Sequence, residues 1–376
     1  MRDQLQISIY DLKIPFKNSF SHTSATRNVT QTIIVEITDG SVTGYGESCP
    51  REYVTGESIK STFHFFDSIK DEVLACVNSF EDLNNYRLEH SKEISDNFAG
   101  WCAIELAFLD FLGRRDRKTL EELFAVDSAF KPTSYSAVIG AKSFEGFAQD
   151  VQKYDQFGFK DFKLKLSGNN EDDYKKLSYL KETVAGSTVR VDANNLWQNL
   201  EDVQDFVKNA PFQLTGIEEP LVSKSLEELV QLSQLIDCKI ILDESFKSIE
   251  DLEIIQDNAG SFVVNLRISK QGGLLNSLDI ARACLKKNIE LIIGAQVGET
   301  AILTRASITL SRTINNEVRT MEGAFGTLFL MEDLTDRSLK FGRNGTLNLV
   351  DFINIEEKGN QLRINAQTIK KFSHES

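Results

Sequence analysis

Residues 161–166 read Asp161-Phe162-Lys163-Leu164-Lys165-Leu166, so two lysines alternate with large apolar side chains. In a β-strand this alternation places the ammonium groups of Lys163 and Lys165 on the same face. Two like charges this close make each other easier to deprotonate, which is a property of catalytic sites. One interpretation is an edge strand whose lysines face water. The other is an inward-facing strand of an active site, and the surrounding sequence decides between them.

From about residue 134 onward, short apolar segments alternate with helical ones. We predict strands near 134–139, 161–166, 188–193, 213–218, 238–243, 261–267, 289–294 and 317–322. Amphipathic segments such as 171–183 and 226–236 lie between them. Alternating strands and helices predict a parallel sheet, and about eight such units favour a closed α/β barrel over an open sheet. No glycine-rich phosphate motif follows the first strand, so a dinucleotide-binding fold lacks its usual support.

A charged residue stands at the end of five consecutive predicted strands. These residues are Lys165, Asp192, Glu218, Asp243 and Arg267, and successive ones are 24 to 27 residues apart. Each interval is one strand–helix unit, so the side chains come from neighbouring strands at the same end of the barrel, where barrel enzymes have their active sites. Three carboxylates in this arrangement predict a hard divalent cation such as Mg²⁺, which prefers oxygen ligands.

Each acid taken alone has an ordinary structural explanation. Asp192 and Asp243 could cap the helices that follow their strands, and Glu218 could begin a loop. It is the joint pattern, with two lysines one strand earlier, that favours a metal site. Glu218 is preferred to Glu219 because neighbouring residues of a strand face opposite ways.

The composition excludes several classes of function. A net charge of −14 argues against nucleic acid and anionic membranes as partners. No apolar run approaches the roughly 18 residues that a membrane span needs, and the first residues lack the apolar core of a signal peptide. The five cysteines are scattered without a metal-binding spacing. We therefore expect reduced thiols and a cytoplasmic protein.

The first third of the chain has a different pattern. Strands near 4–14, 30–38 and 41–47 precede helical periodicity from about 57 to 114, whose clearest part, 98–110, is apolar almost all round. This order predicts an α+β capping domain over residues 1–125, followed by the barrel at 126–341. The tail, 342–376, has strand-like pieces at 346–349 and 361–364 and is expected to return to the capping domain. Residues 15–27, with Phe20 and His22, are either a mobile loop over a pocket or an ordinary strand connection.

Several motifs resemble the enolase superfamily, and within it the muconate-lactonizing-enzyme subgroup. They are Phe162-Lys163-Leu164-Lys165, Val191-Asp192-Ala193-Asn194, Ile217-Glu218-Glu219-Pro220, Leu242-Asp243-Glu244-Ser245, Lys270-Gln271-Gly272-Gly273, Tyr45-Gly46-Glu47 and Tyr53-Val54-Thr55-Gly56-Glu57. The resemblance implies a modified (β/α)7β TIM-like barrel under an α+β cap, one essential Mg²⁺ and a homo-oligomer. It also implies a small carboxylate substrate whose α-proton is removed by a base.

The resemblance and the chemistry together assign roles. Asp192, Glu218 and Asp243 would hold Mg²⁺, which stabilises the enediolate that proton removal creates; lysine bases paired with Mg²⁺ are already known for enolase-type sites. Lys165 is the predicted base, because the cation and Lys163 both favour its neutral form. Lys163 would stay charged and bind the carboxylate. Asn194, Glu244, Phe20, His22 and Glu299 are expected to support the metal site or contact substrate, although Glu299 could equally be a helix N-terminal acid.

Three features restrict the reaction. None of the four histidines lies on a predicted barrel strand, which excludes a mandelate-racemase-type site. Arg267 stands where the subgroup usually has a lysine, and arginine stays protonated, so it is a poor base, although it can pair with a carboxylate. Two-base racemisation would then need Lys270 as the second base. The eighth strand reads Met321-Glu322-Gly323-Ala324-Phe325-Gly326, without the Asp-x-Asp that dipeptide epimerases use for the substrate amino group.

We therefore predict an Mg²⁺-dependent isomerase of the muconate-cycloisomerase kind, acting through an enediolate. The alternatives are a lyase that catalyses syn-dehydration, as o-succinylbenzoate synthase does, and a dipeptide epimerase or racemase if Lys270 acts. A catalytically silent, carboxylate-binding relative is the non-enzymatic alternative, which Arg267 motivates. Three clustered carboxylates argue against it, because an idle site gains nothing from their repulsion.

Overall fold

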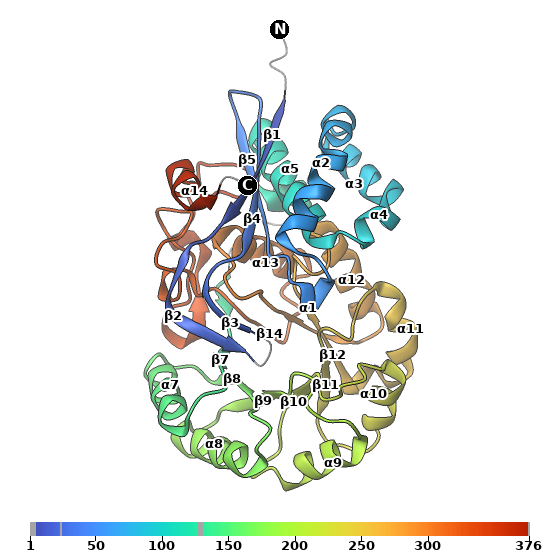
Figure 1. Cartoon of the computed structure of the whole chain (residues 1–376), viewed down its shortest axis with the longest axis vertical. Coiled ribbons are helices and arrows are strands. Elements are labelled where there is room, and N and C mark those ends of the chain that lie inside the picture. The colour runs from blue at the N-terminus through green and yellow to red at the C-terminus, as the bar shows by residue number, and fades with distance from the viewer. Residues whose placement is uncertain (1–4, 23–24, 127–130, 375–376) are drawn as a thin grey trace.

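The computed structural model describes residues 5–22, 25–126 and 131–374. Figure 1 shows a strand-and-helix cap above a barrel whose helices lie outside the strands. In the described part of the chain, no helix is long and apolar enough to cross a membrane.

The barrel contains eight parallel strands in sequence order, as the alternating pattern predicts. They are β7 (Ala137–Ile139), β8 (Asp161–Lys165), β9 (Thr188–Asp192), β10 (Gly216–Glu218), β11 (Lys239–Leu242), β12 (Phe262–Leu266), β13 (Glu290–Ile293) and β14 (Thr320–Met321). A parallel bridge between Tyr135 and Met321 joins the last strand to the first, and the Ser136 N–H donates to the Met321 carbonyl over 2.8 Å. The sheet is therefore closed. The strand containing Lys163 and Lys165 lies between β7 and β9 and is not an edge strand.

Amphipathic helices cover the outside of the barrel. They are α7 (Phe144–Gln156), α8 (Asn170–Thr183), α9 (Leu200–Asn209), α10 (Leu226–Leu232), α11 (Leu252–Ile255), α12 (Leu274–Lys286) and α13 (Ala301–Thr313), with 3₁₀ turns η1 (Ile249–Asp251) and η2 (Gln256–Ser261) around α11. The predicted segment 226–236 is helical only to Leu232, because the next amides of Gln234 and Leu235 bond three residues back and tighten the chain into a turn.

The capping domain is built on an antiparallel sheet in the order β16-β1-β4-β5. Its strands are β1 (Gln6–Leu12), β4 (Thr32–Thr38), β5 (Thr43–Ser48) and β16 (Ser373–His374), and its helices are α1 (Glu52–Thr55), α2 (Ile59–Cys76), α3 (Phe80–Glu89), α4 (Ser91–Ser95), α5 (Phe98–Arg115) and α6 (Leu120–Leu123). Helix α5 is buried almost all round, as its sequence predicts. It lies so close to β5 that a Cβ on Gly46 would overlap the Ala103 backbone.

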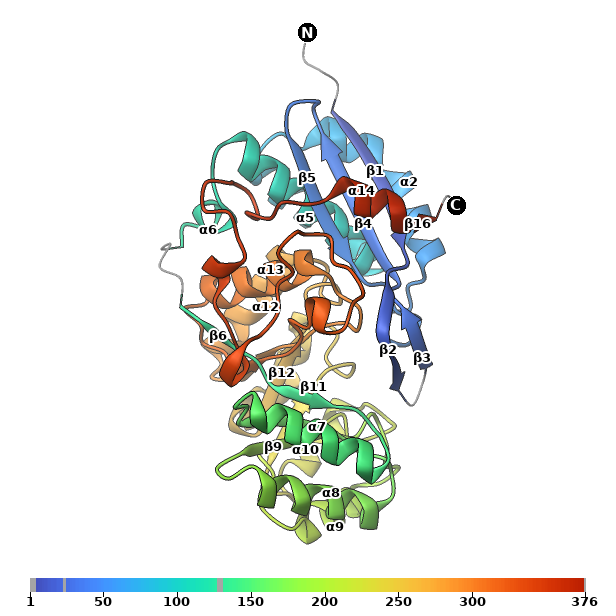
Figure 2. The same cartoon turned by 90° about the vertical axis from the view of Figure 1, so that its left-hand side faces the viewer.

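β2 (Pro15–His22) and β3 (Ala25–Val29) pair antiparallel as the two arms of a hairpin, so the described part of 15–27 is strand and neither an irregular loop nor a simple strand connection. Figure 2 shows the hairpin reaching from the capping sheet towards the barrel. Irregular turns η3 (Gly326–Leu328), η4 (Arg343–Gly345) and η5 (Leu349–Asp351) follow the barrel, and α14 (Ala366–Phe372) precedes β16.

Near the end of the described chain, β16 is antiparallel to β1 of the capping sheet. Of the two predicted tail strands, the first is β15 (Thr346–Leu347), which pairs with β6 (Thr133–Ser134). The prediction of a strand at 361–364 was wrong. In that range the described structure has only one bridge, between Ile364 and Thr335.

Two buried carboxylates attach the cap to the barrel. Glu47 on β5 accepts hydrogen bonds from the amides of Thr300 (2.7 Å) and Leu303 (2.9 Å) at the start of α13. Glu105 on α5 accepts from Leu274 (2.6 Å) and the next amide at the start of α12. Helix N-termini favour such acceptors. These contacts hold the cap over the carboxyl ends of the barrel strands.

Candidate active site

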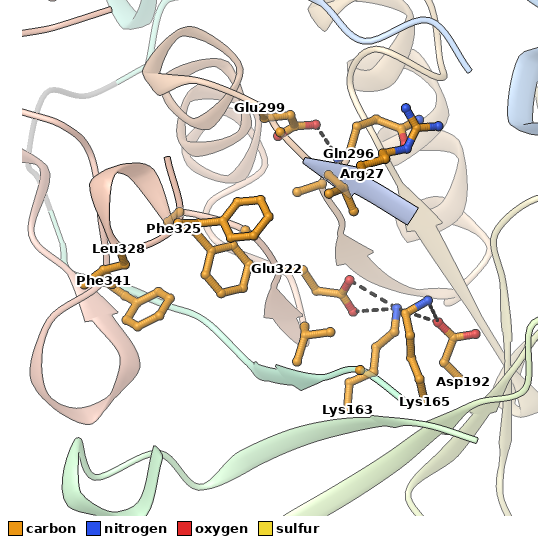
Figure 3. A pocket seen from close by; sticks show the side chains of 18 of the residues that line it. Arg27, Lys163, Lys165, Asp192, Gln296, Glu299, Glu322, Phe325, Leu328 and Phe341 are labelled. Atoms are coloured by element: carbon orange, nitrogen blue, oxygen red, sulfur yellow. Dashed lines mark hydrogen bonds and ion pairs between the residues drawn. The ribbon is translucent and has the colours of Figure 1, made fainter. Parts of the chain in front are cut away.

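A cavity of about 370 Å³ lies at the carboxyl ends of the strands, between the barrel and the hairpin. The ends of β8, β9, β12, β13 and β14 line it from the barrel side. Asn18, Arg27 and Tyr53 line it from the capping domain. Figure 3 shows Lys163, Lys165 and Asp192 at one end and Arg27 near Gln296. The predicted active-site end of the barrel therefore carries a pocket.

Lys163 and Lys165 both point into this pocket, as the alternation in β8 predicts (Figure 3). Lys165 pairs with Asp192 across the β8–β9 register, and its Nζ lies 3.0 Å from Asp192 Oδ2. Lys163 Nζ donates to Glu218 Oε1 over 2.8 Å and lies 3.1 Å from Glu322 Oε1. Burial alone would lower the pKa of Lys163, but these carboxylates raise it above its ordinary value. Lys163 is therefore a fixed positive charge.

The three predicted metal ligands, Asp192, Glu218 and Asp243, are all buried. Glu218 and Asp192 are neighbours in the register of β10 and β9. Glu218 Oε2 is buried without a hydrogen-bond partner among the described residues. Both oxygens of Asp243 face cations: the Arg267 guanidinium contacts Oδ2, and Lys270 Nζ lies 3.3 Å from Oδ1. A buried oxygen such as Glu218 Oε2 is costly unless something binds it, and carboxylate oxygens are what Mg²⁺ prefers. The donor set therefore fits a hard divalent cation.

The present side-chain arrangement is not a finished metal site. Among the described residues, no group of three Asp, Glu, His or Cys side chains is already placed to hold an ion. Basic side chains pair with the proposed ligands instead of a metal ion. Lys163 pairs with Glu218, and the Arg267 guanidinium contacts Asp243 Oδ2. A bound cation would require Arg267 to move off Asp243.

Glu219 faces away from these ligands. Its Oε1 accepts from the amides of Asp243 (2.6 Å) and Ser245 (2.8 Å) and from the Ser245 hydroxyl (2.8 Å). Glu219 thus holds the turn after β11, which supports the preference for Glu218 as the ligand.

Arg267 follows β12 and lines the pocket. Its Nη1 donates to Gln296 Oε1 over 3.1 Å, and its Nη2 lies 3.4 Å from Glu244 Oε1. In a closed ring of eight strands, β12 is opposite β8. The side chain that faces Lys165 across the pocket is therefore an arginine, which keeps its proton.

Lys270 does not stand where a second base is needed. Burial and then the charge of Arg267 lower its pKa to about 7, which would suit a base. However, its Nζ donates to the backbone carbonyl of Asp243 over 2.5 Å and lies 3.4 Å from that of Phe246. It is not among the described side chains that line the pocket. The structure thus gives no support to Lys270 as the second base.

The other predicted residues divide into two groups. Asn194, Glu244 and Glu299 line the pocket. Asn194 accepts from Lys165 Nζ over 3.1 Å, and Glu299 accepts from the Gln296 amide over 2.5 Å. Burial raises the pKa of Glu299 to about 8. The amides at the start of α13 donate to Glu47, Asp333 and the Thr300 hydroxyl and not to Glu299, so Glu299 is not the acid that caps this helix. The side chains of Phe20 and His22 lie outside the described residues.

Glu322 at the end of β14 was not assigned a role from sequence. It lies between two buried cations, with 2.7 Å from Arg190 Nη2 to its Oε1 and 3.2 Å from Lys163 Nζ to its Oε2. Burial opposes ionisation, but Lys163 and Arg190 lower the pKa of Glu322 to about 2. The one sequence feature that could have indicated this role is the alternation in Val189-Arg190-Val191. It places an arginine inside the barrel, where a carboxylate partner is needed. Glu322 is therefore ionised and already paired.

One side of the pocket is apolar. Figure 3 shows Phe325, Leu328 and Phe341 together on the side away from Asp192. The rings of Phe325 and Phe341 meet edge to face, with centroids 5.5 Å apart. Leu330 and the ring of Phe329 extend this surface. The pocket thus offers a polar end for charge and an apolar wall for a hydrocarbon group.

Comparisons with known proteins agree with this fold. Residues 146–350 match the family described as Enolase C-terminal domain-like. The chain is 24% identical to the N-succinyl-L-Arg/Lys racemase of Bacillus cereus, over 98% of this chain and 97% of the racemase. It is 26% identical to the hydrophobic dipeptide epimerase of Enterococcus faecalis, over 85% and 90% of the two chains. A lyase also matches, the o-succinylbenzoate synthase of Bacillus subtilis, at 23% identity over 81% of both chains.

The fold is also that of a solved dipeptide epimerase from Cytophaga hutchinsonii, in a crystal structure with Mg and the dipeptide D-Ala-L-Val. The TM-score is 0.86 at 19% identity, over 99% of each chain. The family match spans more than half of the sequence, and the similar enzymes named above are mostly isomerases. This chain belongs to the Enolase C-terminal domain-like family, and so to the enolase superfamily that its motifs resemble.

Proposed function

We propose that this protein removes the α-proton of a small carboxylate substrate, with Lys165 as the base and Mg²⁺ as the cofactor. The observation that carries the proposal is the position of Lys165, which lines the pocket beside Asp192 and Asn194. Mg²⁺ held by Asp192, Glu218 and Asp243 would supply positive charge against the developing enediolate.

The residues of the chain perform the other steps. Lys163, fixed in its charged form by Glu218 and Glu322, attracts the substrate carboxylate to the polar end of the pocket. Lys165 then takes the α-proton from the face that β8 presents. Asn194 orients the Lys165 amine through the 3.1 Å contact. The apolar wall of Phe325 and Phe341 excludes water from the opposite part of the pocket.

The reaction uses one base. Arg267 faces Lys165 and holds its proton, and Lys270 is bonded behind Asp243. Once moved off Asp243, the Arg267 guanidinium acts as a permanent positive charge beside the enediolate. A one-base cycloisomerisation fits this arrangement best: Lys165 takes the α-proton, the β C–O bond of a lactone ring breaks and its oxygen leaves as a carboxylate, and the reverse reaction closes the ring and takes the proton from the same lysine. A syn-elimination, with Lys165 as base and then as acid, is the second candidate, and the arginine opposite Lys165 favours it as well.

Glu322 argues against a substrate ammonium group. In this structure Glu322 is held by Lys163 and Arg190, so the eighth strand offers no free carboxylate among its described residues. Substrates whose amine is acylated or missing fit better than dipeptides with a free amino end, although dipeptide epimerases are among the relatives. N-succinyl amino acids belong in the first panel, because the Bacillus cereus relative is named for them.

The test is α-proton exchange in D2O with Mg²⁺, followed by ¹H NMR over a panel of N-acyl amino acids and other carboxylates. The proposal predicts exchange in the wild type and a loss of about 10²- to 10⁴-fold in Lys165→Ala. Unchanged exchange in Lys165→Ala would rule Lys165 out as the base.

A further inference from the structure

The cap contributes one positive charge to the pocket, Arg27 on β3. Its guanidinium carbon lies 5.7 Å from the centroid of the Tyr53 ring, and its Nη1 contacts Gln31 Oε1. In the described part of the chain, no Asp or Glu forms an ion pair with it. Figure 3 shows Arg27 near Gln296, apart from the lysine end of the pocket.

The surroundings of Arg27 disfavour its charge. Burial, and then the neighbouring charge of Arg51, lower the pKa of Arg27. Arg51 is itself buried and donates only to main-chain carbonyls, including those of Gln31 and Val297, both over 2.7 Å. Arg27 and Arg51 thus repel each other, and neither forms an ion pair with a described carboxylate. An anion bound to Arg27 would relieve both the desolvation and the repulsion.

The pocket has no spare negative charge that could serve Arg27. Every described acid of the wall already has a basic partner or a hydrogen-bond donor: Asp150 with Lys142, Asp192 with Lys165, Glu322 with Arg190, Glu244 with Arg267, and Glu299 with the Gln296 amide. The pocket therefore favours anions at both ends, although the whole chain carries a net charge of −14.

We propose that Arg27 binds a second carboxylate of the substrate, so that the natural substrate is a dicarboxylate held between the barrel and the cap. The reacting carboxylate lies at the lysine end, and the distal one meets the planar guanidinium, which matches a carboxylate in a two-point contact. The Tyr53 ring lies within cation–π distance of the guanidinium and helps to hold it. The assignment of the reacting end rests on the proposed function, but the distal contact is measurable by itself.

The experiment measures binding to the Mg²⁺-loaded protein by calorimetry. The probes are N-malonyl, N-succinyl and N-glutaryl-L-phenylalanine, each paired with the same compound in which the distal carboxylate is a primary amide. Three chain lengths cover the unknown span, and the benzyl group suits the apolar wall. For the best length, we expect the diacid to bind about 10- to 100-fold more tightly than its amide.

Arg27→Met should bring this ratio close to one. Arg27→Lys, which keeps the charge but loses the planar fork, should leave an intermediate ratio. Lys17→Met is the matched control, because Lys17 is an exposed cation on the same hairpin whose Nζ contacts the Thr327 carbonyl outside the pocket. It removes one charge and one hairpin contact, and we expect it to leave the ratio unchanged.

The proposal is overturned if all three wild-type ratios are near one, if Arg27→Met keeps the ratio, or if Lys17→Met lowers it equally. α-Proton exchange, followed on the same compounds, tests the proposed function separately. Arg27-dependent binding without exchange would contradict the chemistry and leave the dicarboxylate site standing. Exchange that proceeds equally well with the diacid and its amide would support the proposed chemistry and contradict the dicarboxylate site.

Discussion

Lys165 at the end of β8 and Arg267 after β12 line the same pocket from opposite sides of the eight-stranded ring. A lysine at both positions would allow a proton to leave from one face and return to the other. With arginine at the second position, the side chain opposite Lys165 cannot accept a proton at ordinary pH. This relationship makes the stereochemistry of exchange the most informative property of the enzyme.

Replacing the base should abolish proton transfer. We expect Lys165→Ala to lower α-proton exchange by about 10²- to 10⁴-fold, the usual contribution of a positioned base. Lys160→Ala is the control, because Lys160 is an exposed lysine just before the same strand and donates to the Ala185 carbonyl. Exchange should be unchanged in the control, and an equal loss in both variants would point to disruption of the strand.

A lysine opposite Lys165 should allow the configuration of the substrate α-carbon to invert. Arg267→Lys is expected to raise racemisation of an exchanging substrate by about 10²-fold or more, because a second positioned base becomes available. Arg267→Met, which provides no base, should not racemise. Chiral chromatography of the recovered substrate gives the result. Racemisation by the wild type at the rate of exchange would show that another group already acts on the second face.

Mg²⁺ should stabilise the fold through the carboxylates of Glu218, whose Oε2 has no hydrogen-bond partner among the described residues, and Asp243, which now faces Arg267. At a concentration 100 times its Kd, the ion should add about 2.7 kcal/mol to the free energy of unfolding. Glu218→Gln should weaken this stabilisation strongly. Glu219→Gln is the matched neighbour, since Glu219 bonds the turn at Asp243 and Ser245. It should lower the stability itself while keeping the response to Mg²⁺, and thermal melts with EDTA and Mg²⁺ distinguish the two.

Glu299 should produce a pH dependence of substrate binding. Burial raises the pKa of its carboxyl to about 8, so it is neutral at pH 7 and becomes charged as the pH rises through about 8. The new negative charge beside the pocket should repel a carboxylate substrate, so KM should rise above pH 8. Glu299→Gln stays neutral and should remove this rise. A KM profile from pH 6 to 9.5 that is the same for both proteins would exclude Glu299 as the cause.

The strand ends were predictable because they depend on local pattern. Alternation in β8 and a regular interval between charged residues place Lys163, Lys165, Asp192 and Glu218 on neighbouring strands at one end of the barrel. A closed sheet follows from the number of strand–helix units. The opposite orientations of Glu218 and Glu219 were also predictable, because neighbouring residues of a strand point to opposite faces.

The remaining features depend on contacts between distant segments. Lys270 reaches the Asp243 carbonyl because of the geometry of the turn after β12. The pattern of apolar and polar residues does not predict the geometry of such a turn. Arg27 enters the pocket only because the hairpin of β2 and β3 reaches the barrel, and its sequence lacks a strand-like alternation. The pairing of Glu322 with Lys163 and Arg190 joins three strands across the barrel interior.

The measurement that tests the central claim most directly is α-deuterium incorporation in D2O by the Mg²⁺-loaded wild type, with the configuration of the product determined on the same sample. The account predicts exchange that depends on Lys165 and retains the configuration of the substrate. Inversion in step with exchange, or exchange that persists in Lys165→Ala, would contradict it.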